Sequence, residues 1–366
     1  MDNTEELLNK RYNRILKNIE LYSKLYEFNK TPLAMSILVT NRCTLRCKHC
    51  FNHRHQGENS FIADSDELSL EEYEKISKSM GSFMKALFSG GEPFMRKDFK
   101  DIVLMFAQNN NLTHISITTN AQDTDNIFEQ TSYILSKLND KVNLSLGFSL
   151  EGFEEVHDII RGKGTFKNSI NTWNKCQILK NKYSNFDMYI CSTINTINED
   201  TMCDFLRWGI EELFPDSVAL LKVRQNPRDG EYLKEISLDN YYKSMNIIKD
   251  AIKVGKLGDR SMPQTYINAH ICEYVYKTLN TNKKAFDCFA GKYGGFINYN
   301  GDVGGCEILK PYANLADYDY NFNKLWRDFL DDKNKENNEC YSCTHETEGI
   351  IPSLFFGNNK LDNITR

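Results

Sequence analysis

The stretch 34–50, AMSILVTNRCTLRCKHC, decides the fold and holds the most informative motif of the chain. It opens with an apolar run of strand character, after which Cys43, Cys47 and Cys50 follow in CxxxCxxC spacing. Three thiolates this close together can bind three irons of one cubane cluster and leave the fourth iron open. A closed zinc site would need a fourth ligand, which His49 or His53 could supply, so zinc is the alternative.

Working outward from this stretch, strand-like runs alternate with helical patterns over the first two thirds of the chain. The runs cover residues 34–40, 86–89, 114–119, 142–149, 188–193 and 218–223. One helical pattern places apolar side chains three and four residues apart at Phe99, Ile102, Val103 and Phe106. Ser69 and Glu72 form a capping box that predicts the start of another helix. The alternation predicts parallel βα units, arranged as a doubly wound sheet or as a barrel, and periodicity does not choose between the two.

Polar motifs stand where the second, third and fourth strand-like runs end. Residues 89–93 read SGGEP, 118–120 read TTN and 149–152 read SLEG, with HD at 157–158 and RG at 161–162. Together with the CxxxCxxC motif, their order and placement through residues 34–225 resemble the radical S-adenosylmethionine (SAM) superfamily. The resemblance implies a partial six-stranded (β/α) barrel, a TIM-like fold whose sites lie at the carboxyl ends of the strands.

The same resemblance implies SAM and a 4Fe–4S cluster as cofactors. The open iron of the cluster needs a chelating ligand, and the methionine end of SAM offers an amine and a carboxylate. We expect the following residues to bind SAM: His49, Ser89, Gly90, Gly91, Glu92, Asn120, Ser149, Glu151 and Arg161.

Asn120 and Ser149 are candidate hydrogen-bond partners for the ribose or the carboxylate of SAM, and several of the other residues have a structural alternative. Gly90 and Gly91 allow a close backbone approach, although they could form only a tight turn. Glu92 or nearby backbone carbonyls can accept hydrogen bonds from the ammonium, and Arg161 can pair with the carboxylate or form an ordinary surface ion pair. Glu151 stands where many relatives carry Asp. His49 takes a place often held by an aromatic residue, and it could stack near the adenine or be a loop residue.

A second group of cysteines lies near the carboxyl end of the chain and consists of Cys288, Cys306, Cys340 and Cys343. Residues 295–299 and the residues from Asp302 onward predict a β-hairpin with a type I′ turn at Asn300-Gly301. A hairpin returns its two ends to the same place, so we expect it to bring the first two of these thiols together. Four thiolates suit either a Cys₄ zinc site or a fully ligated iron–sulfur cluster.

This group resembles the Twitch domain, the short form of the SPASM extension found in the radical SAM superfamily. Gly301 lies five residues before Cys306, as in the C…GxxxxC element of both domains. Thr344 and Thr347 stand where a full SPASM domain has further cysteines, which implies one auxiliary 4Fe–4S cluster, for two clusters in all. In relatives that oxidise an alcohol or a thiol, a carboxylate at the place of Glu307 can act as the base, so Glu307 is the candidate catalytic residue; the alternative is a solvated residue at the hairpin end.

These observations predict five segments. Residues 1–33 are predicted to form an amphipathic N-terminal helix, and residues 34–230 the radical SAM partial barrel. Residues 231–285 are predicted to be a helical connector. Residues 286–350 are predicted to form the Twitch-like cluster domain, which is a small α+β unit containing the hairpin, and residues 351–366 a tail. A helix is also expected from the spacing of Phe322, Leu325, Trp326 and Phe329.

The remaining cysteines are predicted to be structural. Cys176 and Cys203 have helical neighbours that indicate core packing, and Cys272 is expected in a helix. Cys191 lies on the fifth strand-like run and could point into the barrel beside a substrate, but a buried core position is preferred.

Composition narrows the partners. The net charge of −5 gives no long-range attraction to polyanions, so nucleic acid is not expected as a ligand. The charged first residues lack the apolar region of a secretory signal, and no apolar run is long enough to span a membrane, so a soluble, cytoplasmic protein without membrane contact is predicted. Clustered cysteines in a reducing compartment indicate metal binding more often than disulfides.

The predicted function follows the resemblance. Reductive cleavage of SAM gives a 5′-deoxyadenosyl radical, which abstracts hydrogen from a small-molecule or peptide substrate, and the auxiliary cluster moves an electron in an overall oxidation. An electron donor such as flavodoxin or ferredoxin is expected as a partner. A small metabolite is favoured, because residues 1–33 are too few for a peptide-recognition domain, with a ribosomal-peptide-modifying maturase as the alternative. Two other classes are a non-catalytic two-cluster electron carrier and a zinc-stabilised binding protein.

Overall fold

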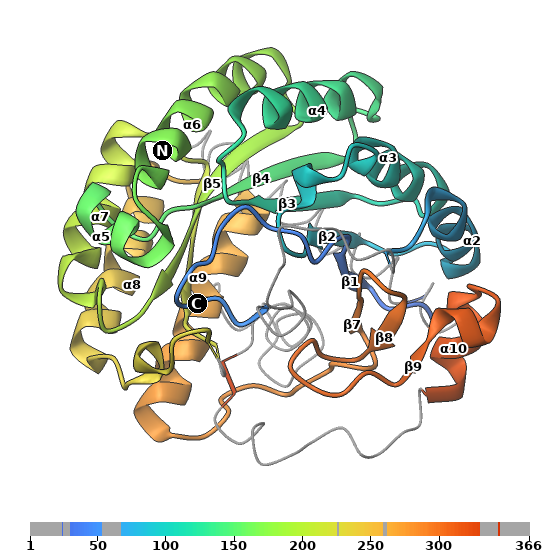
Figure 1. Ribbon diagram of the computed structural model, residues 1–366. Helices are drawn as coiled ribbons and strands as arrows, with labels where there is room; N and C mark the ends of the chain where they lie inside the picture. The colour runs from blue at the N-terminus through green and yellow to red at the C-terminus, as the bar shows by residue number, and fades with distance from the viewer. Residues whose placement is uncertain are drawn as a thin grey trace.

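The computed structural model describes residues 24, 30–52, 67–224, 227–258, 262–329 and 343–344. Most of the helix expected in residues 1–33 lies outside the described residues, as do Cys340, His53 and the tail at 351–366. The described residues 30–33 are not helical, so the expected helix does not reach the first strand. The described part contains one curved sheet of nine strands with helices packed along its outer face (Figure 1).

Six parallel strands form the barrel wall, in the spatial order β6-β5-β4-β3-β2-β1. They are β1 Ala34–Leu38, β2 Lys85–Ser89, β3 His114–Thr119, β4 Asn143–Ser149, β5 Phe186–Ile194 and β6 Ser217–Lys222. Each pairs in parallel with the next strand along the chain, which confirms the predicted βα units and the choice of a partial barrel. The barrel is partial because the sheet does not close on itself.

Helices follow the strands and cover the outer face of the sheet (Figure 1). They are α2 Leu70–Met80, α3 Phe99–Asn109, α4 Thr124–Lys137, α5 Glu154–Arg161, α6 Thr165–Lys182 and α7 Glu199–Glu212. The predicted capping box at Ser69 and Glu72 opens α2 as expected. The apolar stripe of α3 packs on β2, where the rings of Phe99 and Phe106 meet Phe88 edge to face with centroids 6.0 and 5.8 Å away.

Two long helices after the barrel confirm the expected helical character of that segment. They are α8 Leu238–Lys253 and α9 Met262–Thr281. Helix α9 packs along β6, where Thr265 Oγ1 donates to the carbonyl of Asp216 at 3.1 Å and the buried thiol of Cys272 faces the carbonyl of Leu220. This helix therefore covers the edge strand β6, and its residues Asn268 and Ile271 line the cavity inside the barrel.

The C-terminal hairpin is a continuation of the barrel sheet. Strand β7 (Gly294–Ile297) pairs in parallel with β1, then antiparallel with β8 (Asp302–Gly304), which pairs with β9 (Ala313–Asn314). Helix α10 (Phe322–Phe329) is at the predicted place and packs against α2 (Figure 1).

The predicted type I′ turn of this hairpin is wrong. A type I′ turn needs positive φ at both central residues, and Gly301 has φ +89° while Asn300 is not among the residues with positive φ. The loop instead spans residues 298–301, closed by the Gly301 amide donating to the carbonyl of Asn298 at 3.0 Å. The loop is longer because the Asn298 amide donates to the carbonyl of Asp302 at 2.8 Å, so three residues, 299–301, connect this hydrogen-bonded pair instead of two.

Candidate active site

A cavity of about 260 Å³ lies inside the barrel and reaches the carboxyl ends of its strands. Eleven of the residues predicted for the site line it: Cys43, Cys47, His49, Cys50, Ser89, Gly90, Gly91, Asn120, Ser149, Arg161 and Glu307. They come from segments far apart in the sequence, and parallel strands bring them together because all their carboxyl ends meet at one rim. Glu92 and Glu151 lie behind this lining.

The loop after β1 places all three cysteines of the CxxxCxxC motif on the cavity wall. Burial is the main reason that the pKa of the Cys43 thiol rises to about 12 and that of Cys47 to about 11. Such thiols become thiolates when a metal replaces their protons. Two of the sulfurs already face side-chain donors, since Asn120 Nδ2 lies 3.6 Å from Cys43 Sγ and Arg161 Nη1 lies 3.6 Å from Cys47 Sγ. This donor set fits the thiolate ligation and surrounding hydrogen bonds of an iron–sulfur cluster.

Gly90 and Gly91 bring the second motif directly against the cysteine loop. The Gly91 amide donates to the carbonyl of Thr40 and the Glu92 amide to that of Arg42, both at 2.7 Å. A side chain at Gly90 would overlap the Thr40 carbonyl, and one at Gly91 would overlap that of Arg42. Both glycines also line the cavity, but the close approach that requires them is to the loop that carries Cys43.

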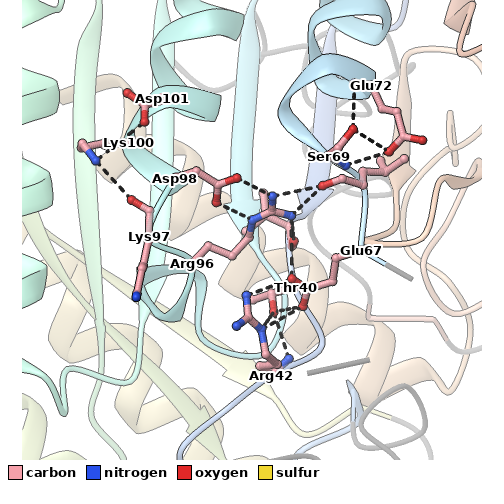
Figure 2. Close-up of polar contacts among 12 residues, drawn as sticks. Thr40, Arg42, Glu67, Ser69, Glu72, Arg96, Lys97, Asp98, Lys100 and Asp101 are labelled. Atoms are coloured by element: carbon pink, nitrogen blue, oxygen red, sulfur yellow. Dashed lines mark hydrogen bonds and ion pairs between the residues drawn. The ribbon is translucent and has the colours of Figure 1, made fainter. Parts of the chain in front are cut away.

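A polar network around Arg96, which the sequence did not indicate, holds the first part of this loop (Figure 2). The Arg96 guanidinium donates to the carbonyls of Val39 and Leu68 at 3.0 Å and forms an ion pair with Asp98 at 2.8 Å. A second ion pair joins Arg42 to Glu67 at 2.9 Å. These contacts fix the backbone between β1 and Cys43, so the cysteine loop begins from a defined position.

Glu92 is buried, with 4% exposure, and its carboxylate binds neighbouring donors of the protein. It accepts from the Asn120 amide at 2.6 Å and from Thr119 Oγ1 at 2.8 Å. Burial raises the pKa of Glu92 to about 7. The carboxylate thereby positions the end of β3 and the Asn120 side chain, whose Nδ2 also lies 3.2 Å from Thr44 Oγ1.

Arg161 and Glu151 form a buried ion pair behind the cysteine loop. Arg161 Nη2 lies 2.6 Å and Nε 3.0 Å from Glu151 Oε1, while Glu151 Oε2 accepts from the Thr193 amide at 2.6 Å. Burial alone would raise the pKa of Glu151, but the charges of Arg161 and His49 and the amide bond hold it below its usual range. His157 accepts from the Glu151 amide at 3.2 Å through Nδ1 and so orients the loop after β4.

His49 lies beside this pair, with Nε2 3.6 Å from Glu151 Oε1. Burial lowers the pKa of His49 to about 4 despite the nearby carboxylate, so its ring is neutral at physiological pH. His49 lines the cavity just before Cys50. This position is compatible with both predicted alternatives, a ring that stacks on a ligand and a ring that only packs in the loop.

Several cavity residues were not predicted from the sequence. They include Lys85, Ser116, Tyr189, Lys222, Arg224 and Asn268. Lys85, Ser116 and Tyr189 occupy inward positions of β2, β3 and β5, and the two-residue period of a strand is the only signal that could have indicated them. The preferred core position for Cys191 is wrong: it is partly exposed and lines the cavity, because it shares the inward face of β5 with Tyr189.

Of the other three cysteines expected to be structural, two lie in the core and one is only partly buried. Cys176 and Cys272 are fully buried, which confirms them as core residues. Cys203 is only partly buried on α7, where its sulfur lies 3.5 Å from Ser244 Oγ.

Glu307 lies on the cavity wall immediately after Cys306 and forms an ion pair with Arg224. The Arg224 guanidinium also lies over the ring of Phe51, 4.5 Å from its centroid. Phe51 follows Cys50, and Arg224 follows the end of β6. The candidate base is therefore held between the cysteine loop and the last barrel strand.

The second cysteine group is described in part. Cys306 is buried, Cys343 is partly buried and Cys288 is exposed. The hairpin brings the chain after Cys288 against the chain before Cys306, because a Cβ at Gly305 would lie 2.7 Å from the Cα of Gly291. Among the described residues, no three His, Cys, Asp or Glu side chains are close enough to share a single metal ion.

A partial parallel barrel with a three-cysteine loop after its first strand is the construction of radical SAM enzymes. Residues 37–208 match the Radical SAM superfamily model. This part of the chain is therefore a radical SAM domain, and the superfamily of that domain binds SAM and a 4Fe–4S cluster.

Two curated relatives differ in how much of the chain they match. Fe-coproporphyrin III synthase of Methanosarcina barkeri is 25% identical over 342 residues, covering 88% of this chain and 80% of that protein. The sporulation killing factor maturation protein SkfB of Bacillus subtilis is 28% identical over 176 residues, covering 47% of this chain and 38% of that protein. The first similarity covers most of the chain and the second about half of it.

Two solved structures share the fold. SuiB of Streptococcus suis bound to S-adenosylmethionine superimposes with a TM-score of 0.60 at 16% identity, covering 87% of this chain and 71% of that one. The structure of anSMEcpe with bound AdoMet gives 0.57 at 16% identity, covering 84% and 82%. Among the described helices, none is long and apolar enough to cross a bilayer.

Proposed function

We propose that the chain binds a 4Fe–4S cluster through Cys43, Cys47 and Cys50 and uses it with SAM to abstract hydrogen from a substrate held in the barrel. Bound together, the reduced cluster and SAM supply a 5′-deoxyadenosyl radical, and this is the chemistry of the cofactors. The observation that supports the proposal is that the three cysteines, the segment Ser89–Gly91, Asn120, Ser149 and Arg161 share one cavity in a radical SAM domain.

The residues around this cavity would bind and orient SAM. Asn120 and Ser149 present polar side chains at the ends of β3 and β4, and Gly90 and Gly91 expose backbone beside the cysteine loop. Arg161 presents Nη1 toward Cys47 while Nη2 stays on Glu151, so its charge can face the cluster or the SAM carboxylate without losing its buried partner. Glu92 supports this arrangement by holding Asn120.

We further propose an auxiliary 4Fe–4S cluster on Cys288, Cys306, Cys340 and Cys343, which would accept an electron when the substrate is oxidised. Glu307 would take a proton from the substrate heteroatom after hydrogen has been abstracted from the adjacent carbon, so that one hydrogen atom, one proton and one electron leave the substrate. Its position on the cavity wall next to Cys306 supports this role, and its ion pair with Arg224 would have to open for proton transfer. A flavodoxin or ferredoxin would supply the electron for SAM cleavage.

A small-molecule substrate is favoured, because the relative that matches 88% of the chain is named for making Fe-coproporphyrin III. A peptide is the second candidate. SkfB is a maturation protein, and SuiB has been solved with the precursor peptide SuiA, a structure that superimposes with a TM-score of 0.57.

The test is anaerobic reconstitution followed by reduction with dithionite in the presence of SAM. We expect 5′-deoxyadenosine from the wild-type protein and none after Cys43, Cys47 and Cys50 are all replaced by Ala, with about half of the iron lost. Cys203→Ser, on α7 away from the cavity, is the matched control and should retain both. Zinc in place of iron, or no SAM cleavage by the wild type, would contradict the proposal.

A further inference from the structure

The cavity extends from the cysteine loop toward the amino ends of the strands, and polar side chains stand among the apolar ones at its deep end. Lys85 is the first residue of β2, at the opposite end of that strand from Ser89. In the pairing of β2 with β3, Lys85 lies opposite His114 and Leu87 lies opposite Ser116. Ser116 therefore lies two residues nearer to the carboxyl ends of the strands than Lys85, on the same inward face of the sheet. The inside of a barrel is normally filled by apolar side chains. Here the ammonium group of Lys85 and the hydroxyl of Ser116 line a cavity instead.

Tyr189 reaches into the same region from β5. Its hydroxyl lies 3.1 Å from Ser116 Oγ on β3, although β4 separates the two strands. The ring crosses β4 at Gly147, where any Cβ would overlap the ring atoms. The glycine therefore permits a phenol to lie across the sheet, which places two hydroxyl groups on the cavity wall.

The charges of the lining are unequal. Its described residues include the cations Lys85, Arg161, Lys222 and Arg224, and the carboxylate of Glu307. The two arginines are paired with carboxylates, namely Glu151 and Glu307. Carboxylates that do not line the cavity act on the lysines: Asp187 on Lys85, and Glu235 on Lys222. The space inside the barrel is therefore faced by more positive than negative groups.

Lys85 is the most deeply placed of these cations. It is 8% exposed, and burial lowers its pKa to about 8, against the opposing effect of Asp187. His114 beside it is held neutral, because burial and the Lys85 charge lower its pKa well below the usual value. Because water is largely excluded at this depth, the attraction between the Lys85 ammonium and an anion in the cavity is stronger than it would be at the surface.

We propose that the deep end of the cavity is a subsite for an anionic oxygen group of the substrate, a carboxylate or a phosphate. Lys85 binds it by charge, and Ser116, Tyr189 and Asn268 bind it by hydrogen bonding. The identification of the occupant as the substrate rests on the proposed function, whereas the anion site itself does not. An anchor at this depth would hold the substrate by the end remote from the cysteine loop and leave its other end near Ser89 and Ser149 for reaction.

The test measures binding of inorganic phosphate, succinate and the uncharged succinamide to the full-length protein by calorimetry. We expect phosphate or succinate to bind and succinamide not to bind. Lys85→Met should weaken anion binding by about tenfold or more, as expected for loss of a charged hydrogen bond. Lys78→Met is the matched control, because Lys78 lies on α2 with 63% of its side chain exposed, and it should change affinity less than twofold, roughly the error of such measurements.

Which anion binds identifies the source of the group, phosphate or carboxylate. Binding that depends on Lys222 and survives Lys85→Met would overturn the assignment, as would failure of both anions to bind. Failure of the proposed function is separately visible as absence of 5′-deoxyadenosine from the wild-type protein.

A second measurement uses the wild-type protein and does not depend on folding of the variant. Competitive acetylation with labelled acetic anhydride, read by mass spectrometry, reports the fraction of each lysine that is neutral. Saturating anion should reduce acetylation of Lys85 several-fold and leave Lys78 unchanged. Unchanged acetylation of Lys85 at saturating phosphate and succinate would overturn the proposal.

Discussion

The guanidinium of Arg224 forms an ion pair with the carboxylate of Glu307 and so joins the last barrel strand to the residue after Cys306. The same guanidinium lies over the ring of Phe51, the residue after Cys50. One side chain thus contacts the neighbours of both cysteine groups. It follows that substitutions at Glu307 are expected to act on proton transfer and on this connection together, and experiments must separate the two.

Glu307→Gln removes the proposed base and keeps the size of the side chain. We expect product formation to fall by at least about tenfold, because general-base assistance is lost. Iron content and hydrogen abstraction, followed by deuterium transfer into 5′-deoxyadenosine, should persist. Asp317→Asn, on the exposed turn η4 (Leu315–Tyr318), is the control and should leave product formation unchanged. Unchanged product formation in Glu307→Gln would mean that Glu307 is not the base.

Arg161→Ala removes the partner of a carboxylate that is fully buried. We expect the protein to lose about 3–5 kcal/mol of stability, because Glu151 is left without its cation. SAM binding should weaken by tens of fold or more, in line with a loss of about 2–5 kcal/mol for a desolvated charge pair. The double variant Arg161→Ala with Glu151→Gln separates these effects: thermal stability should recover in part and SAM affinity should not. SAM affinity within twofold of the wild type would assign Arg161 to structure alone.

Gly91→Ala should disturb the cysteine loop. The added Cβ would overlap the carbonyl of Arg42, and the overlap is with backbone that cannot rotate away. We expect a destabilisation of about 1–3 kcal/mol and reduced iron incorporation after anaerobic reconstitution. Gly230→Ala is the matched control, since nothing lies within 4 Å of its Cβ position. Equal iron content in the two variants would show that the loop adapts.

Replacing Cys340 and Cys343 by Ala tests the auxiliary cluster. If these residues are its ligands, iron should fall by about half and product formation should stop. Uncoupled SAM cleavage should continue, because the CxxxCxxC loop is untouched. Electron paramagnetic resonance of the reduced protein checks that one cluster signal remains. Full iron content in this variant would remove the basis for an auxiliary cluster.

Lys85→Met should stabilise the cofactor-free protein at neutral pH. The folded pKa of Lys85 is about 8, below the ordinary value of 10.5, so the folded state disfavours its charged form. Below pH 8 the full cost of keeping Lys85 charged in the folded state is present, roughly 1–3 kcal/mol. This cost disappears as the pH rises from the folded pKa of about 8 to the ordinary value of 10.5. Denaturant unfolding at a series of pH values should show the gain over the wild type shrinking above pH 8. Asp187 and His114 face Lys85 and contribute to both proteins. A gain that does not vary with pH would contradict this assignment.

Local sequence signals predicted much of the barrel. Six strands and helix α3 occur where their apolar patterns placed them, and helix α2 begins at the capping box of Ser69 and Glu72. Each of these signals depends on neighbouring residues alone. The convergence of the motifs on one cavity followed from parallel connectivity.

Features that depend on contacts between distant segments were not predicted. The Arg96 network forms only when the segments after β1 and β2 meet. The Arg161–Glu151 ion pair forms only when helix α5 folds back on the end of β4. The inward direction of Cys191 and Tyr189 depends on the register of β5, and Tyr189 also needs the space above Gly147. No short stretch of sequence contains that information.

The parallel pairing of β7 with β1 has a consequence for dissecting this protein. If the chain were cut before Gly294, residues Ala34–Leu38 would become an edge strand with a row of unpaired backbone groups, which is a template for aggregation. An isolated N-terminal fragment is therefore expected to be poorly behaved even though it would contain the whole CxxxCxxC motif. Chimeras that exchange the C-terminal region with a relative should keep a strand in the place of β7, so that β1 stays in the interior of the sheet.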